Sequence, residues 1–137
     1  MEEYMPEKLL EAKAPEVKIE KQGLTLLWTN SNPYTSMSPT TISIDASGYA
    51  WLLLMCKGAG KSGASNAWMT SVILTDKNQT YSVSIHNQTD SGVWQSRYFT
   101  WTDSGLTVGS GKQTNPFGNE RNADNTACVP YKIYGFK

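Results

Sequence analysis

The segment AWLLLMCK, residues 50–57, decides the fold class, because its apolar side chains fall on both faces of the strand that it predicts. Successive side chains of a β-strand point to opposite faces, so an apolar run of this kind is typical of a strand buried between two layers. We therefore expect residues 50–57 to form the central strand of the domain.

The sequence on either side predicts further strands with one packed face and one solvated face. In QTYSVSIHN, residues 79–87, the side chains of Tyr81, Val83 and Ile85 alternate with two serines and His86. Short runs with strand character recur at LTLLWTN (24–30), TISID (41–45), AWMTSVILTD (67–76), WQSRYFTWT (94–102) and CVPYKIYGFK (128–137). About eight such strands, separated by polar turns, predict an all-β fold: an antiparallel β-sandwich or jelly roll.

Turn residues between these runs predict the connections. Residues 76–78 predict a hairpin that joins 67–76 to 79–87, and residues 103–105 predict a second one after 94–102. Residues 58–66 and 109–127 are rich in Gly, Ser and Asn, so we expect two loops there.

The first 22 residues differ in composition from the rest of the chain. They carry six glutamates and four lysines, and their sequence predicts a short N-terminal helix or an extended segment that Pro15 interrupts. The apolar residues Met5, Leu9 and Leu10 are too few to fold alone, so this segment either docks on another subunit or protein or stays disordered. We expect residues 1–22 to be an attachment segment and residues 23–137 to be the β-sandwich domain.

Charge and hydropathy exclude several kinds of partner. Twelve basic and twelve acidic residues give a net charge of zero, which argues against binding to nucleic acid. No apolar stretch is long enough for insertion into a membrane. The start, MEEYMPEKLLEA, lacks the pattern of a signal peptide, so we expect synthesis in the cytoplasm.

The residues needed for catalysis are scarce, so the sequence predicts a protein that is not an enzyme. His86 is the only histidine and falls on the polar face of a strand, where an ordinary surface role is expected. The Gly-Lys-Ser at residues 60–62 lacks the first glycine of a phosphate-binding loop, because Met55 stands at that position. We expect no cofactor and no metal, and we expect Cys56 and Cys128 to be buried thiols unless neighbouring strands let them form one bridge.

The aromatic residues are the most suggestive feature of the composition, with five tryptophans and seven tyrosines. Trp28 and Trp51 lie in the strongest apolar runs and are predicted to pack in the core. The other three tryptophans, Trp68, Trp94 and Trp101, have polar neighbours and are open to a surface role. Flat aromatic faces stack on sugar rings, so Trp68 and Trp94, with hydrogen bonds from Arg97, are the candidate ligand-binding residues.

Three segments, in this order, carry a resemblance to a known family. They are Leu26-Leu27-Trp28-Thr29-Asn30 with Pro33 nearby, Ile42-Ser43-Ile44-Asp45 leading to Ser47-Gly48-Tyr49, and Cys128-Val129-Pro130-Tyr131-Lys132-Ile133-Tyr134-Gly135 preceded by residues 122–125. Together these segments resemble the small structural proteins of phages and prophages of Gram-positive bacteria, over residues 24–137.

The resemblance implies a virion component, such as a tail-fibre, baseplate or head-fibre β domain. It implies a homo-oligomer, with a trimer favoured, and a β domain that faces the host and can contact a cell-surface glycan. From composition we add that residues 1–22 attach the protein to other virion proteins. The alternatives are a free carbohydrate-binding module, which the missing signal peptide disfavours, and a small hydrolase, which the sparse acids and single histidine disfavour.

Overall fold

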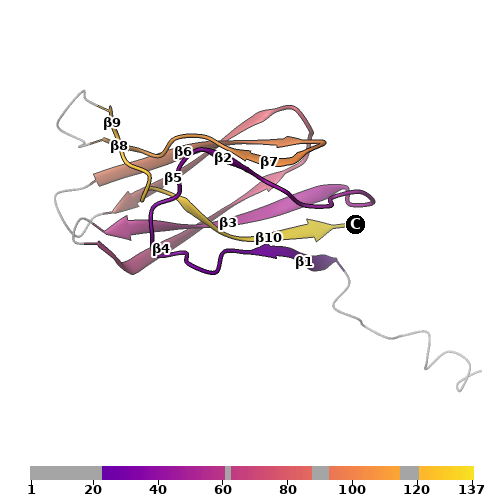
Figure 1. Cartoon of the computed structure of the whole chain (residues 1–137), viewed down its shortest axis with the longest axis horizontal. Helices are drawn as coiled ribbons and strands as arrows, with labels where there is room; N and C mark the ends of the chain where they lie inside the picture. Colours follow the sequence, from indigo (N-terminus) through magenta and orange to yellow (C-terminus); the bar gives the residue numbers. More distant parts are fainter. Residues whose placement is uncertain (1–22, 61–62, 88–92, 115–120) are drawn as a thin grey trace, which may run out of the picture.

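The computed structural model describes residues 23–60, 63–87, 93–114 and 121–137, and these residues form antiparallel sheets without any helix (Figure 1). One sheet has four strands, in the order β1 (Leu24–Thr29), β10 (Val129–Phe136), β3 (Trp51–Gly60) and β4 (Gly63–Leu74). The other has the order β2 (Thr40–Ile42), β7 (Gly105–Val108), β6 (Val93–Thr102), β8 (Lys112–Thr114) and β9 (Arg121–Ala123), with β5 (Thr80–Asn87) also paired to β6. The all-β prediction is confirmed, and the strands are consistent with a β-sandwich.

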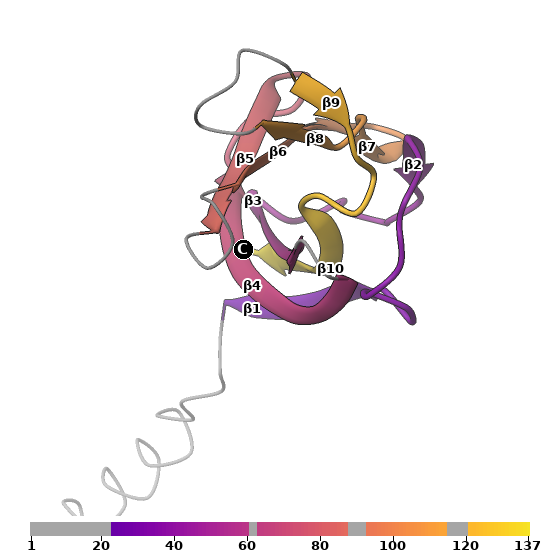
Figure 2. The same ribbon diagram turned by 90° about the vertical axis from the view of Figure 1, so that its left-hand side faces the viewer.

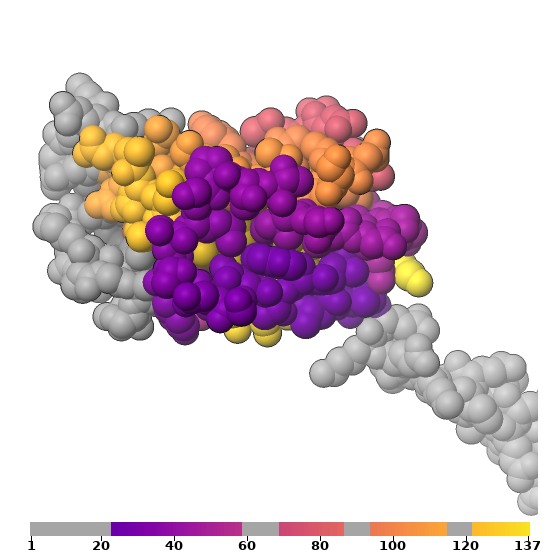
Figure 3. Space-filling view, viewed as in Figure 1, coloured from indigo at the N-terminus to yellow at the C-terminus, as the bar shows by residue number. Residues whose placement is uncertain are grey.

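The two sheets pack face to face around one core. Viewed end-on, the sheet that contains β5, β6 and β7 lies above the sheet that contains β1, β10 and β3 (Figure 2). The passage from β4 to β5 lies on one side, and the segment from β1 to β2 closes the other. The atoms of this segment cover that flank in the space-filling view (Figure 3).

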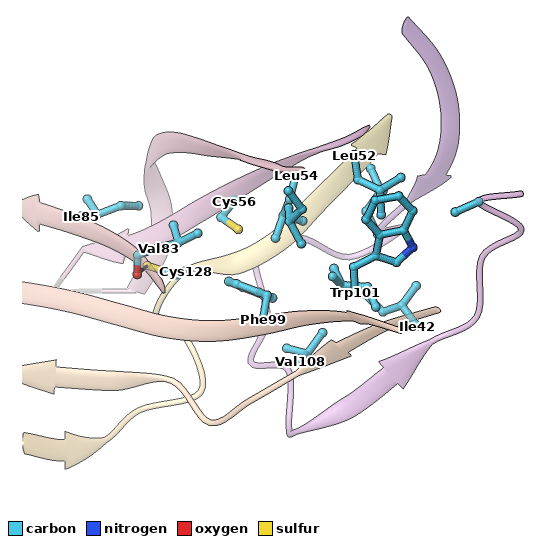
Figure 4. Close-up of a cluster of buried hydrophobic side chains, with 14 residues drawn as sticks. Ile42, Leu52, Leu54, Cys56, Val83, Ile85, Phe99, Trp101, Val108 and Cys128 are labelled. Carbon is cyan, nitrogen blue, oxygen red and sulfur yellow. Dashed lines mark hydrogen bonds between the residues drawn. The ribbon is translucent and has the colours of Figure 1, made fainter. Parts of the chain in front are cut away.

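Alternation along the strands fills the core, as the sequence predicted. Leu52, Leu54 and Cys56 of β3 point inward and are fully buried, while Phe99 and Trp101 of β6 face them from the other sheet (Figure 4). The remaining buried apolar side chains of the cluster are Ile42, Ala46, Leu74, Val83, Ile85, Leu106, Val108, Cys128 and Ile133. β3 lies between β10 and β4, so residues 50–57 do supply an interior strand.

The predicted hairpin at residues 76–78 is wrong, because the chain changes sheet there. β4 pairs with β3, whereas β5 pairs with β6. The Tyr81 hydroxyl accepts hydrogen bonds from the backbone N–H groups of Thr75 and Asp76, at 3.1 and 2.9 Å, and the Asn78 N–H bonds the carbonyl of Trp101 at 2.7 Å. These bonds hold a corner between the sheets. The other predicted hairpin, from β6 to β7, is confirmed.

The two glycine-rich stretches predicted as loops contain strand as well. β3 continues to Gly60 and β4 begins at Gly63, with a register shift between Gly58 and Gly60. A Cβ atom at Gly58 would lie 2.7 Å from Oε1 of Gln95 and 2.8 Å from Ile85, so β3 packs closely against the second sheet at this point. Within residues 109–127, the short strands β8 and β9 extend the second sheet beyond β6.

The prediction that Trp51 packs in the core is wrong, and strand register explains why. The same register decides the position of Trp101, which the sequence left open to a surface role. Trp51 begins β3 on the outward row and is 43% exposed. Trp101 lies on the inward row of β6 and is 3% exposed. Trp28 packs against the core as predicted. The predicted N-terminal helix or extended segment, residues 1–22, lies outside the described residues.

Two glycines with positive φ provide a matched test of the β6–β7 turn. At Gly48 (φ +81°) a Cβ atom would meet nothing within 4 Å, whereas at Gly105 (φ +131°) it would collide with the Ile42 carbonyl oxygen of β2. We expect Gly48→Ala to cost about 1 kcal/mol of unfolding free energy from backbone strain. Gly105→Ala should cost about 1–3 kcal/mol more, because β2 must move. Urea denaturation measures both, and equal losses would contradict the packing of β2 on this turn.

Candidate functional site

The outer face of β5 and β6 is polar apart from three aromatic side chains. The two strands pair in a continuous register, so their outward residues stand opposite one another as Thr80 with Thr100, Ser82 with Tyr98, Ser84 with Ser96 and His86 with Trp94. The buried inward residues are the apolar Val83, Ile85, Phe99 and Trp101 and, on β6, the polar Gln95 and Arg97. This face is therefore where the second sheet meets solvent.

His86 and Trp94 form a stacked pair near one end of this face. Their ring centroids are 4.2 Å apart and the two planes differ by 9°. Trp94 remains 46% exposed. Tyr98 lies on the same outward row of β6, beyond Ser96, and is 47% exposed. We call His86, Trp94 and Tyr98 the aromatic platform. Because His86 is held against it, the Trp94 ring is partly fixed before any ligand arrives, which lowers the entropic cost of stacking a ligand on it.

Hydroxyl groups lie along the same face, with Ser84 and Ser96 next to the His86–Trp94 pair and a row of threonines at the opposite end. One row across four strands consists of threonines: Thr80, Thr100, Thr107 and Thr41. The side-chain oxygens of Thr80 and Thr100 lie 3.3 Å apart, and those of Thr41 and Thr107 lie 3.5 Å apart. Hydroxyls donate and accept hydrogen bonds, which suits a ligand that is itself rich in hydroxyls.

The three residues predicted to bind a ligand do not face one surface. Trp94 and Arg97 are three positions apart in β6, and an odd spacing places side chains on opposite faces of a strand. Trp94 is exposed, whereas Arg97 is 1% exposed. Trp68 lies in β4 opposite Gly58, and its side chain is outside the described part. Ligand binding by these residues stays a prediction.

Arg97 joins three chain segments beneath the second sheet. Its guanidinium donates hydrogen bonds to the backbone carbonyls of Ala127, Met37 and Asn125, at 2.9, 2.8 and 2.8 Å. Burial lowers the pKa of this guanidinium from its ordinary value, and the nearby Asp124 carboxylate opposes that shift. An arginine stays protonated in proteins, so the positive charge of Arg97 is stabilised mainly by the dipoles of these three carbonyl groups.

The two cysteines are buried, as the sequence predicted, and both are free thiols, without the bridge that the sequence left open. Burial raises the pKa of Cys128 to about 12, and the charge of Arg97 offsets part of that rise. Burial also raises the pKa of Cys56 well above its ordinary value. Both groups are therefore neutral thiols at physiological pH, and neither is activated as a nucleophile.

A small polar hollow of about 200 Å³ lies at one end of the sandwich, beside residues 44–47 and 101–103. Lys77 and Asp103 at its rim form an ion pair of 3.1 Å, with both side chains largely exposed. Such exposed pairs contribute about 0–1 kcal/mol. Among the described residues, no group of three or more His, Cys, Asp or Glu side chains is placed to hold a metal ion.

Sequence reasoning missed two members of the aromatic platform. It identified Trp94 and placed His86 on a polar strand face, but it did not bring the two together. The hairpin register that pairs His86 with Trp94 carries that information. Tyr98 shares the outward row with Trp94, so period-two alternation was the available signal.

Comparison of the chain with family models, curated proteins and solved structures finds no match. In the described part of the chain, no helix has the length and hydropathy to cross a membrane.

Replacing Arg97 tests its role as the link between three segments. We expect Arg97→Met to lower the unfolding free energy by about 3–5 kcal/mol, because three carbonyls lose their charged donor. Arg97→Lys should lose less, since one ammonium keeps the charge but cannot bond three separate carbonyls. Urea denaturation gives both values. A methionine variant as stable as the wild type would contradict the assigned role.

The raised pKa of Cys128 predicts a loss of stability at alkaline pH. Cys128 keeps its proton to about pH 12 in the folded chain but loses it near pH 9 when unfolded, so the folded state binds more protons within that window. The free energy of unfolding should therefore fall as pH rises from about 9 towards 12. The Cys128→Ala variant should show a shallower fall, measured by urea denaturation across the window. Identical slopes would contradict the raised pKa.

Proposed function

We propose that this protein is a non-enzymatic virion component whose β-sandwich presents the aromatic platform to a glycan on the host cell surface. The observation that carries the ligand part of the proposal is the exposed Trp94 ring, stacked on His86, with the hydroxyls of Ser84 and Ser96 in the neighbouring row. The resemblance of residues 24–137 to small structural proteins of phages of Gram-positive bacteria supports the virion part.

Stacking on an aromatic ring suits a sugar for a physical reason. One face of a pyranose ring presents C–H groups, which pack against the flat apolar surface of an indole. The sugar hydroxyls then need polar partners, and Ser84, Ser96 and Tyr98 lie on the same face as Trp94. A shallow site of this kind binds a single sugar weakly.

Weak binding at one site becomes useful when many copies act together. A homo-oligomer, with a trimer favoured, would hold several platforms on one particle and raise the overall affinity without any new contact. Residues 1–22 would connect the domain to the other virion proteins. A free carbohydrate-binding module would use the same platform and is the second candidate, because the Trp94–His86 pair favours it equally.

The experiment compares two tryptophans on opposite sheets, which have similar exposure in the described part of the chain. Trp94 is 46% exposed on the second sheet, and Trp51 is 43% exposed on the first. We expect Trp94→Ala to reduce binding to whole Gram-positive cells and their isolated wall polysaccharides at least tenfold, a loss of about 1.4 kcal/mol. Trp51→Ala should bind as the wild type does. The full chain, displayed at high density on beads, is the probe.

Thermal unfolding accompanies each binding measurement. The melting temperature of Trp94→Ala should stay close to that of the wild type, because the ring lies on the surface. Equal losses of binding in both variants would argue against the platform, and so would unchanged binding in Trp94→Ala.

A further inference from the structure

The outer face of the four-stranded sheet is apolar over half its length, unlike the polar outer face of the second sheet. Leu24 of β1, Phe136 of β10 and Trp51 of β3 form one row across three strands. The rings of Trp51 and Phe136 stack, with centroids 5.1 Å apart. The next row crosses all four strands, with Leu26, Tyr134, Leu53 and Ile73. We call these two rows the apolar face.

The side chains of the apolar face are large and only partly covered. Leu24, Leu26, Trp51 and Ile73 are 51%, 50%, 43% and 54% exposed. A hollow of about 240 Å³ lies among them and is lined almost wholly by apolar atoms. Large contiguous apolar patches on soluble proteins often mark binding surfaces. The exposed rows and the hollow among them therefore suit a covering segment.

The described part of the chain begins at the edge of the apolar face. Gly23, the first described residue, has a φ of +130°, and a Cβ atom there would lie 2.6 Å from the Phe136 ring. Its backbone therefore rests against a member of the apolar face, and Leu24, the next residue, lines the hollow. The 22 residues before Gly23 start from this edge. Extended, they would reach about 70 Å, well beyond the roughly 40 Å of the 12-residue strand β4.

The sequence of residues 1–22 is complementary to the sheet in both charge and hydropathy. Six glutamates and four lysines give the segment a net charge of −2. The four strands of the sheet contain no acidic residue and two lysines, Lys57 and Lys132, which lie on the same outer side beyond the apolar rows. The segment also supplies apolar side chains, with Leu9 and Leu10 adjacent and Val17 and Ile19 in alternation with charged residues.

We propose that residues 1–22 pack on the apolar face of their own domain, with Leu9, Leu10, Val17 and Ile19 toward the sheet and the glutamates toward its lysines. The segment is then a covering layer of the sandwich, and its remaining charged side is what a partner would meet. This inference does not depend on glycan binding, because the aromatic platform is on the other sheet.

Hydroxyl-radical labelling of the full chain, read by mass spectrometry, tests the proposal with an internal control. Trp51 and Trp94 are almost equally exposed in the described part of the chain, so an open apolar face would let them react to similar extents. If residues 1–22 cover the face, Trp51 reacts severalfold less than Trp94.

Two full-length variants then identify what covers the face. The first carries Leu9→Ser, Leu10→Ser, Val17→Ser and Ile19→Ser, and it should raise Trp51 labelling to the level of Trp94. The control carries Glu7→Ser, Lys8→Ser, Glu16→Ser and Lys18→Ser, which keeps both the net charge and the apolar residues. It should retain the protection of Trp51.

Three results would overturn the proposal. Equal labelling of Trp51 and Trp94 in the wild type would mean that the face is open. Protection of Trp51 that survives in the first variant would mean that another element covers it. Protection that disappears on dilution, together with a fall in mass by light scattering, would assign the face to a second copy of the chain.

Discussion

The guanidinium of Arg97 holds two connecting segments of this sandwich against its second sheet. A charged group with 1% exposure is tolerable only when its donors are used, and here three backbone carbonyls accept them. One of these carbonyls belongs to Met37, in the segment between β1 and β2. The other two belong to Asn125 and Ala127, which lead into β10. Neither segment lies in a sheet ladder at these residues. One side chain therefore positions the two connections that close this end of the core.

The fold class was predictable because it depends on period-two alternation, which is a local property. Val83 and Ile85 on β5 are buried as the alternation indicated. Sheet membership is not local, and the β4–β5 connection shows the difference: its sequence matches a hairpin, yet Tyr81 and Asn78 hold a corner between two sheets. Trp51 was misplaced for a related reason, since an apolar run with two apolar faces does not tell which face is the core.

The candidate site was predictable in part. Trp94 could be picked out by its polar neighbours, but the role of Arg97 could not, because an arginine among polar residues resembles a surface residue in sequence. Its burial follows from the inward row that it shares with Phe99 and Trp101, and its partners come from segments 28 to 60 residues away. The stack of His86 on Trp94 also needs the register of two strands, which composition does not supply.

The two outer faces of the sandwich have opposite chemistry, and this limits what each can do. The face with the threonine row and the aromatic platform is solvated, so a ligand there must replace water by hydrogen bonds of similar strength, and stacking supplies the net gain. The apolar face gains free energy when an apolar segment covers it, because the hydrophobic effect is not directional. The polar face thus suits the proposed recognition of a ligand, and the apolar face suits the proposed covering segment. A segment tied to the edge of the apolar face at Gly23 has a high effective concentration there, which gives it an advantage over any free partner.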